Sequence, residues 1–204
     1  KVSTTLFATG YAAGLAMKEK GTNKAGFITG PELDFSKQAA TAFEAGIKNV
    51  IPDATVAITY TGDFNDSAKA KEAAQAMIDQ GVGLIYPYLG GATDAVAQLA
   101  NQHDVFVVTP GTDRCQDTKT PFSISSVFDP GVFFAAALAD FAKGSLPMGQ
   151  TREWQIGVDP VPTVIACGDL ASLQPQIDDV MKQIGAGTLD VDAIISLGAS
   201  PAAS

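Results

Sequence analysis

The sequence predicts an α/β domain in which helices cover both faces of a doubly wound, mainly parallel sheet. Short apolar segments rich in Val, Ile and aromatic residues recur along the chain, and stretches with helical spacing separate them. Successive apolar segments begin about 25–30 residues apart, which is the length of a strand–helix–strand crossover rather than of a hairpin. The two periods together indicate parallel strands joined by helices.

Four consecutive buried strands are expected near residues 24–29, 54–60, 82–87 and 104–109. The intervening helices each carry an apolar stripe, formed by Phe43, Ile47 and Val50, by Ala70, Ala74, Met77 and Ile78, and by Ala95, Val96, Leu99 and Ala100. Gly81 follows the second stripe and is expected to end that helix in a left-handed conformation.

Beyond Thr109 the sequence predicts further strands and helices, which are shorter than those before it. A fifth strand is expected at residues 122–127, followed by a helix that Asp129 caps, Pro130 opens and Gly144 ends. Two short strands at 153–158 and 161–166 are expected around a turn, and Pro162 favours a sheet edge. A last helix runs from about residue 175 to 184. Residues 1–195 thus form a single lobe, and the small residues of 196–204 predict a flexible tail or linker.

Composition excludes several classes of function. The chain has 204 residues, 46% of them hydrophobic, which is enough for a substantial core, and a formal net charge of −9, which argues against a nucleic-acid partner. It lacks an apolar run long enough for a membrane span. Two cysteines without CxxC spacing and a single His103 give neither a metal motif nor a catalytic triad. We therefore expect no metal, no cofactor and no enzyme activity.

Ligands of open parallel sheets bind beyond the carboxyl ends of the strands, so the loops at 30–34, 61–66, 87–93 and 110–115 are the candidate site. Phe64 could stack on a planar solute, Gly90 and Gly91 would permit close backbone approach, and Asp113 could accept a hydrogen bond. The alternatives are that Phe64 caps the local core, that the glycine pair is a plain turn and that Asp66 is a helix N-cap. Of Tyr86 and Tyr88, one is expected to face the cleft and the other the core.

Several segments resemble a known family. Residues 8–16 (ATGYAAGLA) and 24–30 (KAGFITG) are similar to a passage of the basic-membrane-protein and PnrA-like nucleoside-binding lipoproteins of ABC transporters. Residues 43–46, 60–72, 76–81, the pair Gly90 and Gly91, and residues 184–191 continue the likeness in order. The resemblance implies one lobe, mainly the C-terminal one, of a type I periplasmic-binding-protein fold. Of the family's two carboxylates after strand four only Asp113 remains, and residues 126–128 lack its lysine.

The resemblance also implies a function. It predicts an extracytoplasmic solute-binding module of an ABC-type uptake or sensing system, for nucleosides or other small planar solutes, whose partner is a membrane transporter or a tethered membrane protein. The location would be periplasmic or at the cell surface, with a membrane anchor in the full-length protein. The alternative is a non-catalytic interaction or scaffold domain of a secreted or tethered protein that binds no small molecule.

Two further expectations follow from an extracytoplasmic single lobe. Cys115 and Cys167 are expected to form a disulfide, the competing reading being two separate buried thiols. A lobe that lacks its second wall should bind solute weakly and should expose an apolar patch, which self-association into a homo-oligomer could cover.

Overall fold

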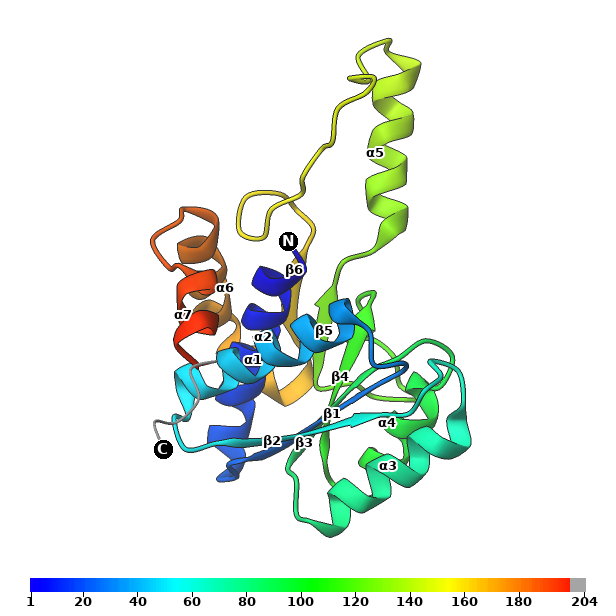
Figure 1. The fold of residues 1–204 in the computed structure, drawn as a ribbon, viewed down its shortest axis with the longest axis vertical. Coiled ribbons are helices and arrows are strands. Elements are labelled where there is room, and N and C mark those ends of the chain that lie inside the picture. Colours follow the sequence, from blue (N-terminus) through cyan, green and yellow to red (C-terminus); the bar gives the residue numbers. More distant parts are fainter. Residues whose placement is uncertain (199–204) are drawn as a thin grey trace.

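The structure, a computed structural model, describes residues 1–198. Of the predicted tail at 196–204, residues 199–204 lie outside the described residues. Six strands form one sheet in the order β2-β1-β3-β4-β5-β6 (Figure 1). They are β1 (Lys24–Thr29), β2 (Thr55–Tyr60), β3 (Leu84–Tyr88), β4 (Phe106–Gly111), β5 (Ile124–Val127) and β6 (Thr163–Ala166). All neighbours pair in parallel except β5 and β6. The predicted run of four parallel strands is confirmed.

Helices cover both faces of the sheet, as the sequence predicts. One face carries α1 (Val2–Lys20), α2 (Asp34–Val50), α6 (Gln174–Gly185) and α7 (Val191–Gly198), and the other carries α3 (Ser67–Asp79) and α4 (Thr93–Gln102) (Figure 1). A 3-10 helix, η1 (Gly168–Leu173), leads into α6. Buried side chains form a separate cluster on each face, so the central strands are buried on both sides.

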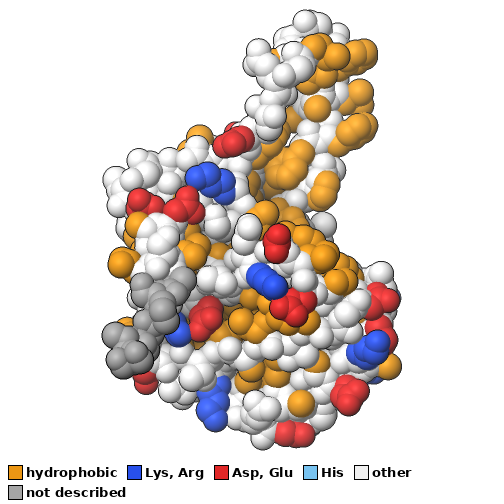
Figure 2. Space-filling view, viewed as in Figure 1, with side chains coloured by type: hydrophobic (Ala, Val, Ile, Leu, Met, Phe, Trp, Pro, Cys, Tyr) orange, Lys and Arg blue, Asp and Glu red, His pale blue; other side chains and the backbone are white. Residues whose placement is uncertain are grey.

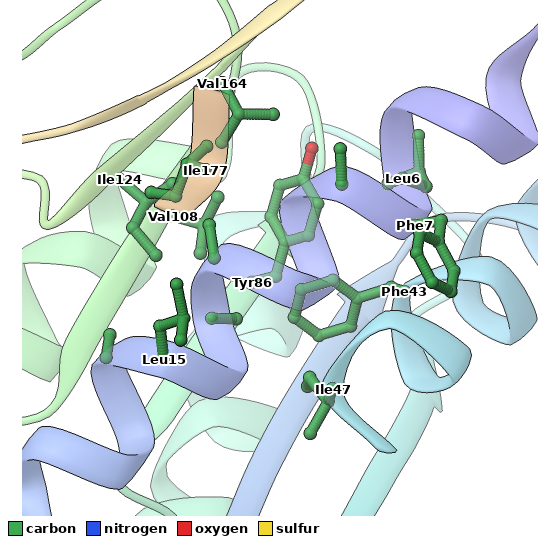
Figure 3. Close-up of a cluster of buried hydrophobic side chains, with 14 of the residues drawn as sticks. Leu6, Phe7, Leu15, Phe43, Ile47, Tyr86, Val108, Ile124, Val164 and Ile177 are labelled. Atoms are coloured by element: carbon green, nitrogen blue, oxygen red, sulfur yellow. The ribbon is translucent and has the colours of Figure 1, made fainter. Parts of the chain in front are cut away.

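The larger core lies between the sheet and the first two helices. Tyr86 from the sheet meets Phe43 from α2, with ring centroids 5.2 Å apart (Figure 3). The ring of Phe27, from β1, lies 5.5 Å from that of Phe43 and 5.4 Å from that of Tyr86. Burial raises the pKa of Tyr86 above that of an exposed tyrosine. Gly10 and Gly46 let α1 and α2 touch backbone to backbone, since an added Cβ would lie 2.0 and 2.1 Å from carbonyl oxygens of the facing helix.

The local signals for helix ends are confirmed where the sequence named them. The Asp66 carboxylate caps α3 by accepting hydrogen bonds from the backbone N–H groups of Ala68 and Lys69, at 3.1 and 3.0 Å. Gly81 follows α3 with a φ of 80°. Asp129 caps α5 (Pro130–Ala142), in which Pro130 is the first residue.

The predicted pair of strands after residue 150 is half wrong. Only the second forms, as β6, which pairs with β5 at the sheet edge. Residues 153–158 turn instead, because Gly157 has a φ of 76° and the N–H of Val158 bonds back to the carbonyl of Gln155. Ile156 is buried, and Gly157 lies so close to α6 that an added Cβ would be 1.9 Å from the Met181 carbonyl oxygen.

Two helices, α1 and α7, were not anticipated, nor was the position of α5. Helix α1 is buried through its middle and lacks a one-sided apolar stripe, which is why its periodicity gives no signal. Helix α7 occupies residues 191–198 and so includes the first three residues of the predicted tail. Helix α5 was predicted, but it projects away from the body and none of its residues is buried (Figure 1). Among residues 1–198, no helix is both long and apolar enough to cross a membrane.

Candidate functional site

The strand order creates a crevice at the carboxyl edge of the sheet. Strand β1 has β2 on one side and β3 on the other, so the chain reverses its direction of winding between β1 and β3, where open α/β sheets bind ligands. A groove of about 370 Å³ lies at this edge. Its lining comes from the loops and strand ends that follow all five parallel strands, namely Phe35, Phe64, Tyr88, Leu89, Gly90, Pro110, Gly111 and Phe128.

Phe64 is held over this crevice by its surroundings. Its carbonyl oxygen accepts hydrogen bonds from the backbone N–H groups of Gly90 and Ala92, at 3.0 and 3.3 Å. Its ring lies against Gly30, where an added Cβ would be only 2.6 Å from the ring. The ring of Phe35 stacks on it, with centroids 6.1 Å apart and planes inclined by 19°. Phe64 therefore has a defined position in the groove.

Gly90 and Gly91 hold the loop that carries Phe64. The N–H of Gly91 donates to the side-chain oxygen of Asn65 at 2.8 Å, and that of Gly90 donates to Phe64. An added Cβ at Gly90 or Gly91 would lie 2.9 or 3.0 Å from the Asn65 oxygen, so a side chain at either position would push the Asn65 amide aside. Both N–H groups thus bond to protein, and Gly90 alone of the pair lines the groove.

Tyr86 and Tyr88 divide between core and groove. Both project from the same side of β3, because residues two apart in a strand share a face. Tyr86 is fully buried, whereas Tyr88 lies one step nearer the edge and lines the groove, with its ring 6.3 Å from that of Phe128. Partial burial raises the pKa of Tyr88, so its hydroxyl stays neutral at physiological pH and can donate a hydrogen bond.

Asp113 does not line the groove. It is exposed, and its carboxylate accepts a hydrogen bond from the backbone N–H of Cys115 at 2.9 Å. Cys115 itself is joined to Cys167 by a disulfide with an S–S distance of 2.05 Å. Asp113 lies within 4.8 Å of both sulfur atoms, but sulfur in a disulfide offers no thiolate to a metal ion.

Arg114 anchors the loop between β4 and β5. Its guanidinium pairs with Asp94 of α4 and with Asp117 of the same loop, and it lies 4.4 Å above the ring of Phe122. The backbone N–H of Thr120 and then the Arg114 guanidinium lower the pKa of Asp117 to about 2. These contacts hold the loop that directly follows Pro110 and Gly111, the last two residues of β4, which line the groove.

The sequence reasoning missed two aromatic residues of the groove, Phe35 and Phe128. Both stand where the carboxyl-edge rule would have found them, because Phe35 opens the helix after β1 and Phe128 directly follows β5. The groove is therefore mainly aromatic. None of the described residues that line it is charged, and Tyr88 supplies the one hydroxyl among their side chains. Such a surface suits stacking on a flat solute and offers no general acid or base near neutral pH.

Comparison with known proteins agrees with this geometry. The model of the Bmp family, described as "ABC transporter substrate-binding protein PnrA-like", matches residues 2–184. The nucleoside-binding protein BmpA of Lactococcus lactis is 40% identical over 87 residues, which are 42% of this chain and 25% of that protein. A purine-binding protein of Brucella abortus is 33% identical over 88 residues, covering 43% and 23%. The alignments thus span about a quarter of these relatives' length.

Solved structures support the fold. A solute-binding protein of an ABC transporter system from Conexibacter woesei superposes with a TM-score of 0.67 at 23% identity, over 93% of this chain and 63% of that one. A transcriptional activator of the comK gene from Bacillus halodurans gives 0.72 at 20% identity, over 89% and 63%. In both comparisons more than a third of the longer chain has no counterpart here.

Proposed function

Because the chain belongs to the Bmp family of PnrA-like ABC transporter substrate-binding proteins, we propose that it is the solute-binding module of an ABC-type uptake system. Its proposed ligand is a small planar solute of the nucleoside class, which is the class named for BmpA of Lactococcus lactis, while the Brucella abortus relative is named for purines. The module would work outside the cytoplasm beside a membrane transporter, and its role would be binding rather than catalysis.

The observation that carries this proposal is the fixed position of Phe64 in an aromatic groove. Three further rings, those of Phe35, Tyr88 and Phe128, line the same groove. Flat heterocycles stack on such rings, and every nucleobase has a face that can do so. The Tyr88 hydroxyl could orient the solute by a hydrogen bond.

The four residues named from the sequence enter the proposal with different support. Phe64 would stack on the solute, and Gly90 would form the groove wall. Gly91 would act by fixing the Phe64 loop, since its N–H bonds to Asn65. Asp113 has less support than the others, because its carboxylate bonds to the N–H of Cys115 and stands outside the groove.

Affinity should be weak, because the groove is open on the side away from the sheet edge. Stacking and a single hydrogen bond each contribute on the order of 1 kcal/mol at such a site. A dissociation constant of about 1 mM corresponds to about 4 kcal/mol, which is what one wall with a few such contacts can supply. A much lower dissociation constant would require a second protein surface that encloses the solute.

Titration followed by NMR chemical shifts is the appropriate test, because it measures millimolar binding. Adenosine, inosine and uridine should shift the amide signals of residues 62–65, 89–91 and 111, and ribose alone should not. Phe64→Ala should weaken nucleoside binding about tenfold through loss of stacking. Phe106→Ala is the matched control, because Phe106 begins β4 at the opposite end of the sheet and carries the Lys20 ammonium 4.3 Å above its ring.

If nucleosides bound tightly and Phe64→Ala did not change their dissociation constant, the solute would bind outside this groove. Equal shifts from ribose and from nucleosides would show that the groove selects sugars rather than planar bases. If Phe106→Ala weakened binding as much as Phe64→Ala, the loss would reflect a general disturbance of the fold.

A further inference from the structure

The rings that line the candidate groove can attract a positive charge as well as stack on a flat solute. They lie in two pairs, Phe35 with Phe64 and Tyr88 with Phe128, whose centroids are 6.1 and 6.3 Å apart. The face of an aromatic ring carries partial negative charge, so it attracts a cation that lies within about 6 Å of its centre. Proteins bind organic cations in cages of several such rings. The lining therefore suits a positively charged heterocycle at least as well as a neutral one.

An aspartate stands directly beside three of these four rings in the sequence. The neighbours are Asp34 with Phe35, Asp63 with Phe64, and Asp129 with Phe128. The Cα atoms of neighbouring residues are about 3.8 Å apart, so each carboxylate lies within about one Debye length, 8–10 Å, of its ring. Among the described residues, none of these three carboxylates forms an ion pair. Their negative charges therefore act on whatever occupies the groove.

The helix N-termini at this edge oppose the aspartates only in part. Helices α2, α3, α4 and α5 begin after parallel strands, and each N-terminus carries roughly half a positive elementary charge. The loops after the parallel strands hold six carboxylates and one guanidinium, that of Arg114, within residues 30–34, 61–66, 87–93, 110–115 and 128–129. Arg114 is already paired with Asp94 and Asp117. The carboxylates outweigh the helix dipoles, so the potential at the groove is negative.

The opposite edge of the sheet and the projecting helix contribute little charge at the groove. Asp104, just before β4, pairs with Lys20 at 3.1 Å. Helix α5 has one charged residue, Asp140, whose carboxylate pairs with Arg152 at 3.2 Å, and Figure 2 shows mainly hydrophobic side chains along this helix. The field in the groove therefore comes mainly from the loops at the carboxyl edge.

We propose that the groove selects its solute by charge, and that its preferred ligand is a planar heterocycle with a positive charge, such as an N-methylated purine nucleoside. This inference rests on the proposed function, because it takes the groove of Phe64 as the binding site. Asp34, Asp63 and Asp129 are its specificity-determining residues, which act through their charge beside the rings. A nucleotide is disfavoured, because its phosphate brings negative charge to the same edge.

NMR titration of the 204-residue chain with three solutes of similar shape tests the proposal. At neutral pH 1-methyladenosine is cationic, adenosine is neutral and adenosine 5′-monophosphate is anionic. At about 10 mM ionic strength, 1-methyladenosine should bind about tenfold more tightly than adenosine, and the monophosphate about tenfold more weakly. At about 1 M salt the Debye length falls from about 30 Å to about 3 Å, so both ratios should shrink at least about threefold.

The double variant Asp63→Asn and Asp129→Asn separates charge from local structure. The two carboxylates accept hydrogen bonds from the backbone N–H groups of Asn65 and Gly131, each at 2.8 Å. An asparagine oxygen can accept the same bonds, so the turn and the helix cap are kept while the charges are removed. The ratio of the dissociation constants of adenosine and 1-methyladenosine should fall at least about threefold in this variant.

The double variant Asp53→Asn and Asp79→Asn is the matched control. Asp53 precedes β2 and Asp79 ends α3, so these two exposed carboxylates lie at the opposite edge of the sheet. The net charge of the chain changes by the same amount, and the ratio should stay as in the wild type. Circular dichroism checks that both double variants are folded. An equal fall of the ratio in the control would show that net charge, and not the aspartates beside the rings, selects the solute.

The outcomes distinguish this proposal from the proposed function. Equal affinity for the three solutes would overturn charge selection and leave nucleoside binding intact. Tightest binding of adenosine 5′-monophosphate would overturn charge selection as well. If none of the three solutes shifted the amide signals of the groove, the proposed function would fail, and charge selection with it.

Discussion

The position of Phe64 depends mainly on the glycine residues around it and on a hydrogen bond made by its neighbour Asn65. The absence of a side chain at Gly30 leaves room for its ring, and the glycine pair after β3 lets Asn65 approach the backbone. The residue proposed to touch a solute and the residues that hold it in place are therefore different ones. In the proposed site, Asn65 would be a positioning residue for Phe64.

Replacing Asn65 by Ala should loosen the Phe64 loop. The hydrogen bond to the Gly91 N–H is lost, and the free energy of unfolding should fall by about 1 kcal/mol, the typical value of such a bond. Nucleoside affinity in the NMR titration should fall as well, because the ring of Phe64 is no longer fixed before binding. Urea unfolding and the titration measure the two effects.

Asn101→Ala separates positioning from stability. The Asn101 side chain, on α4, also bonds to a backbone atom distant in sequence, donating to the Pro121 carbonyl at 3.0 Å, but it lies outside the groove. It should cost a similar free energy of unfolding and leave nucleoside affinity unchanged. If both variants weakened binding equally, the assignment of a positioning role to Asn65 would be wrong.

For single residues, the sequence predicted which loops lie at the carboxyl ends of the strands, but it did not predict which side chains turn away through local hydrogen bonds. Phe64 could be named because the loop after a parallel strand reaches the ligand edge. Asp113 obeys the same rule, yet its carboxylate turns back to the N–H of Cys115 two residues on, a local bond that spacing does not reveal. The sequence analysis mentioned residues 126–128 only because they lack the lysine of the family, although the ring of Phe128 lines the groove.

The loop from β4 to β5 illustrates how a long connection is kept in place. Arg114 joins the loop to α4 through Asp94, and the disulfide joins it to Cys167, directly after β6. The Asp117 carboxylate closes a turn by accepting hydrogen bonds from the backbone N–H groups of Lys119 and Thr120, at 2.9 and 3.0 Å. The loop thus behaves as a structured element rather than a free connection.

Acid should release part of this loop. The pKa of Asp117 is about 2, below the value of about 3.9 for an unfolded aspartate. Because the folded pKa is the lower one, the ionised carboxylate contributes stability above about pH 4, and that contribution is lost as the pH falls through about 2. An NMR titration of the side-chain carboxyl carbon should give a midpoint near the lower value.

Arg114→Gln tests the cause of that midpoint. The pKa of Asp117 should rise in this variant but should stay below the ordinary value, because the backbone N–H of Thr120 still donates to it. A midpoint near 3.9 in the wild type would show that the turn is not formed in solution.

Among whole elements, the regular strand–helix repeats could be predicted from the sequence, whereas α1 and the turn at 153–158 could not. The last predicted helix, α6, was found with nearly correct bounds. The stripe predicted at Phe43, Ile47 and Val50 lies in α2. Helix α1 is surrounded by other elements through its middle, so its apolar residues lie on all sides and show no period. The segment 153–158 has the composition of a strand, but the positive φ of Gly157 turns it onto α6.

For the whole molecule, the repeat of strand and helix was sufficient to predict the parallel, doubly wound sheet, because right-handed crossovers leave few alternatives. The direction of α5 was not predictable in the same way. Its sequence indicates a helix with apolar residues, but whether such a helix packs on its own body or on another depends on surfaces far away in the chain.

The disulfide has one further consequence for the projecting helix α5. Cys115 and Cys167 are 52 residues apart, and α5 and the segment 143–153 that returns from it lie between them. Lys143 and Arg152 are exposed in this returning segment, where limited trypsin digestion should cut first. The nicked protein should run as a single species in a non-reducing gel and as two fragments after reduction. Two separate fragments without reductant would contradict the bond.

A covalent loop that spans α5 means that a protease can interrupt the chain without dismantling the domain. The fragment that begins after the cut contains β6, which still pairs with β5, and α6, which still packs on the core. The projecting helix could then be trimmed while the carboxyl edge of the sheet and its groove survive.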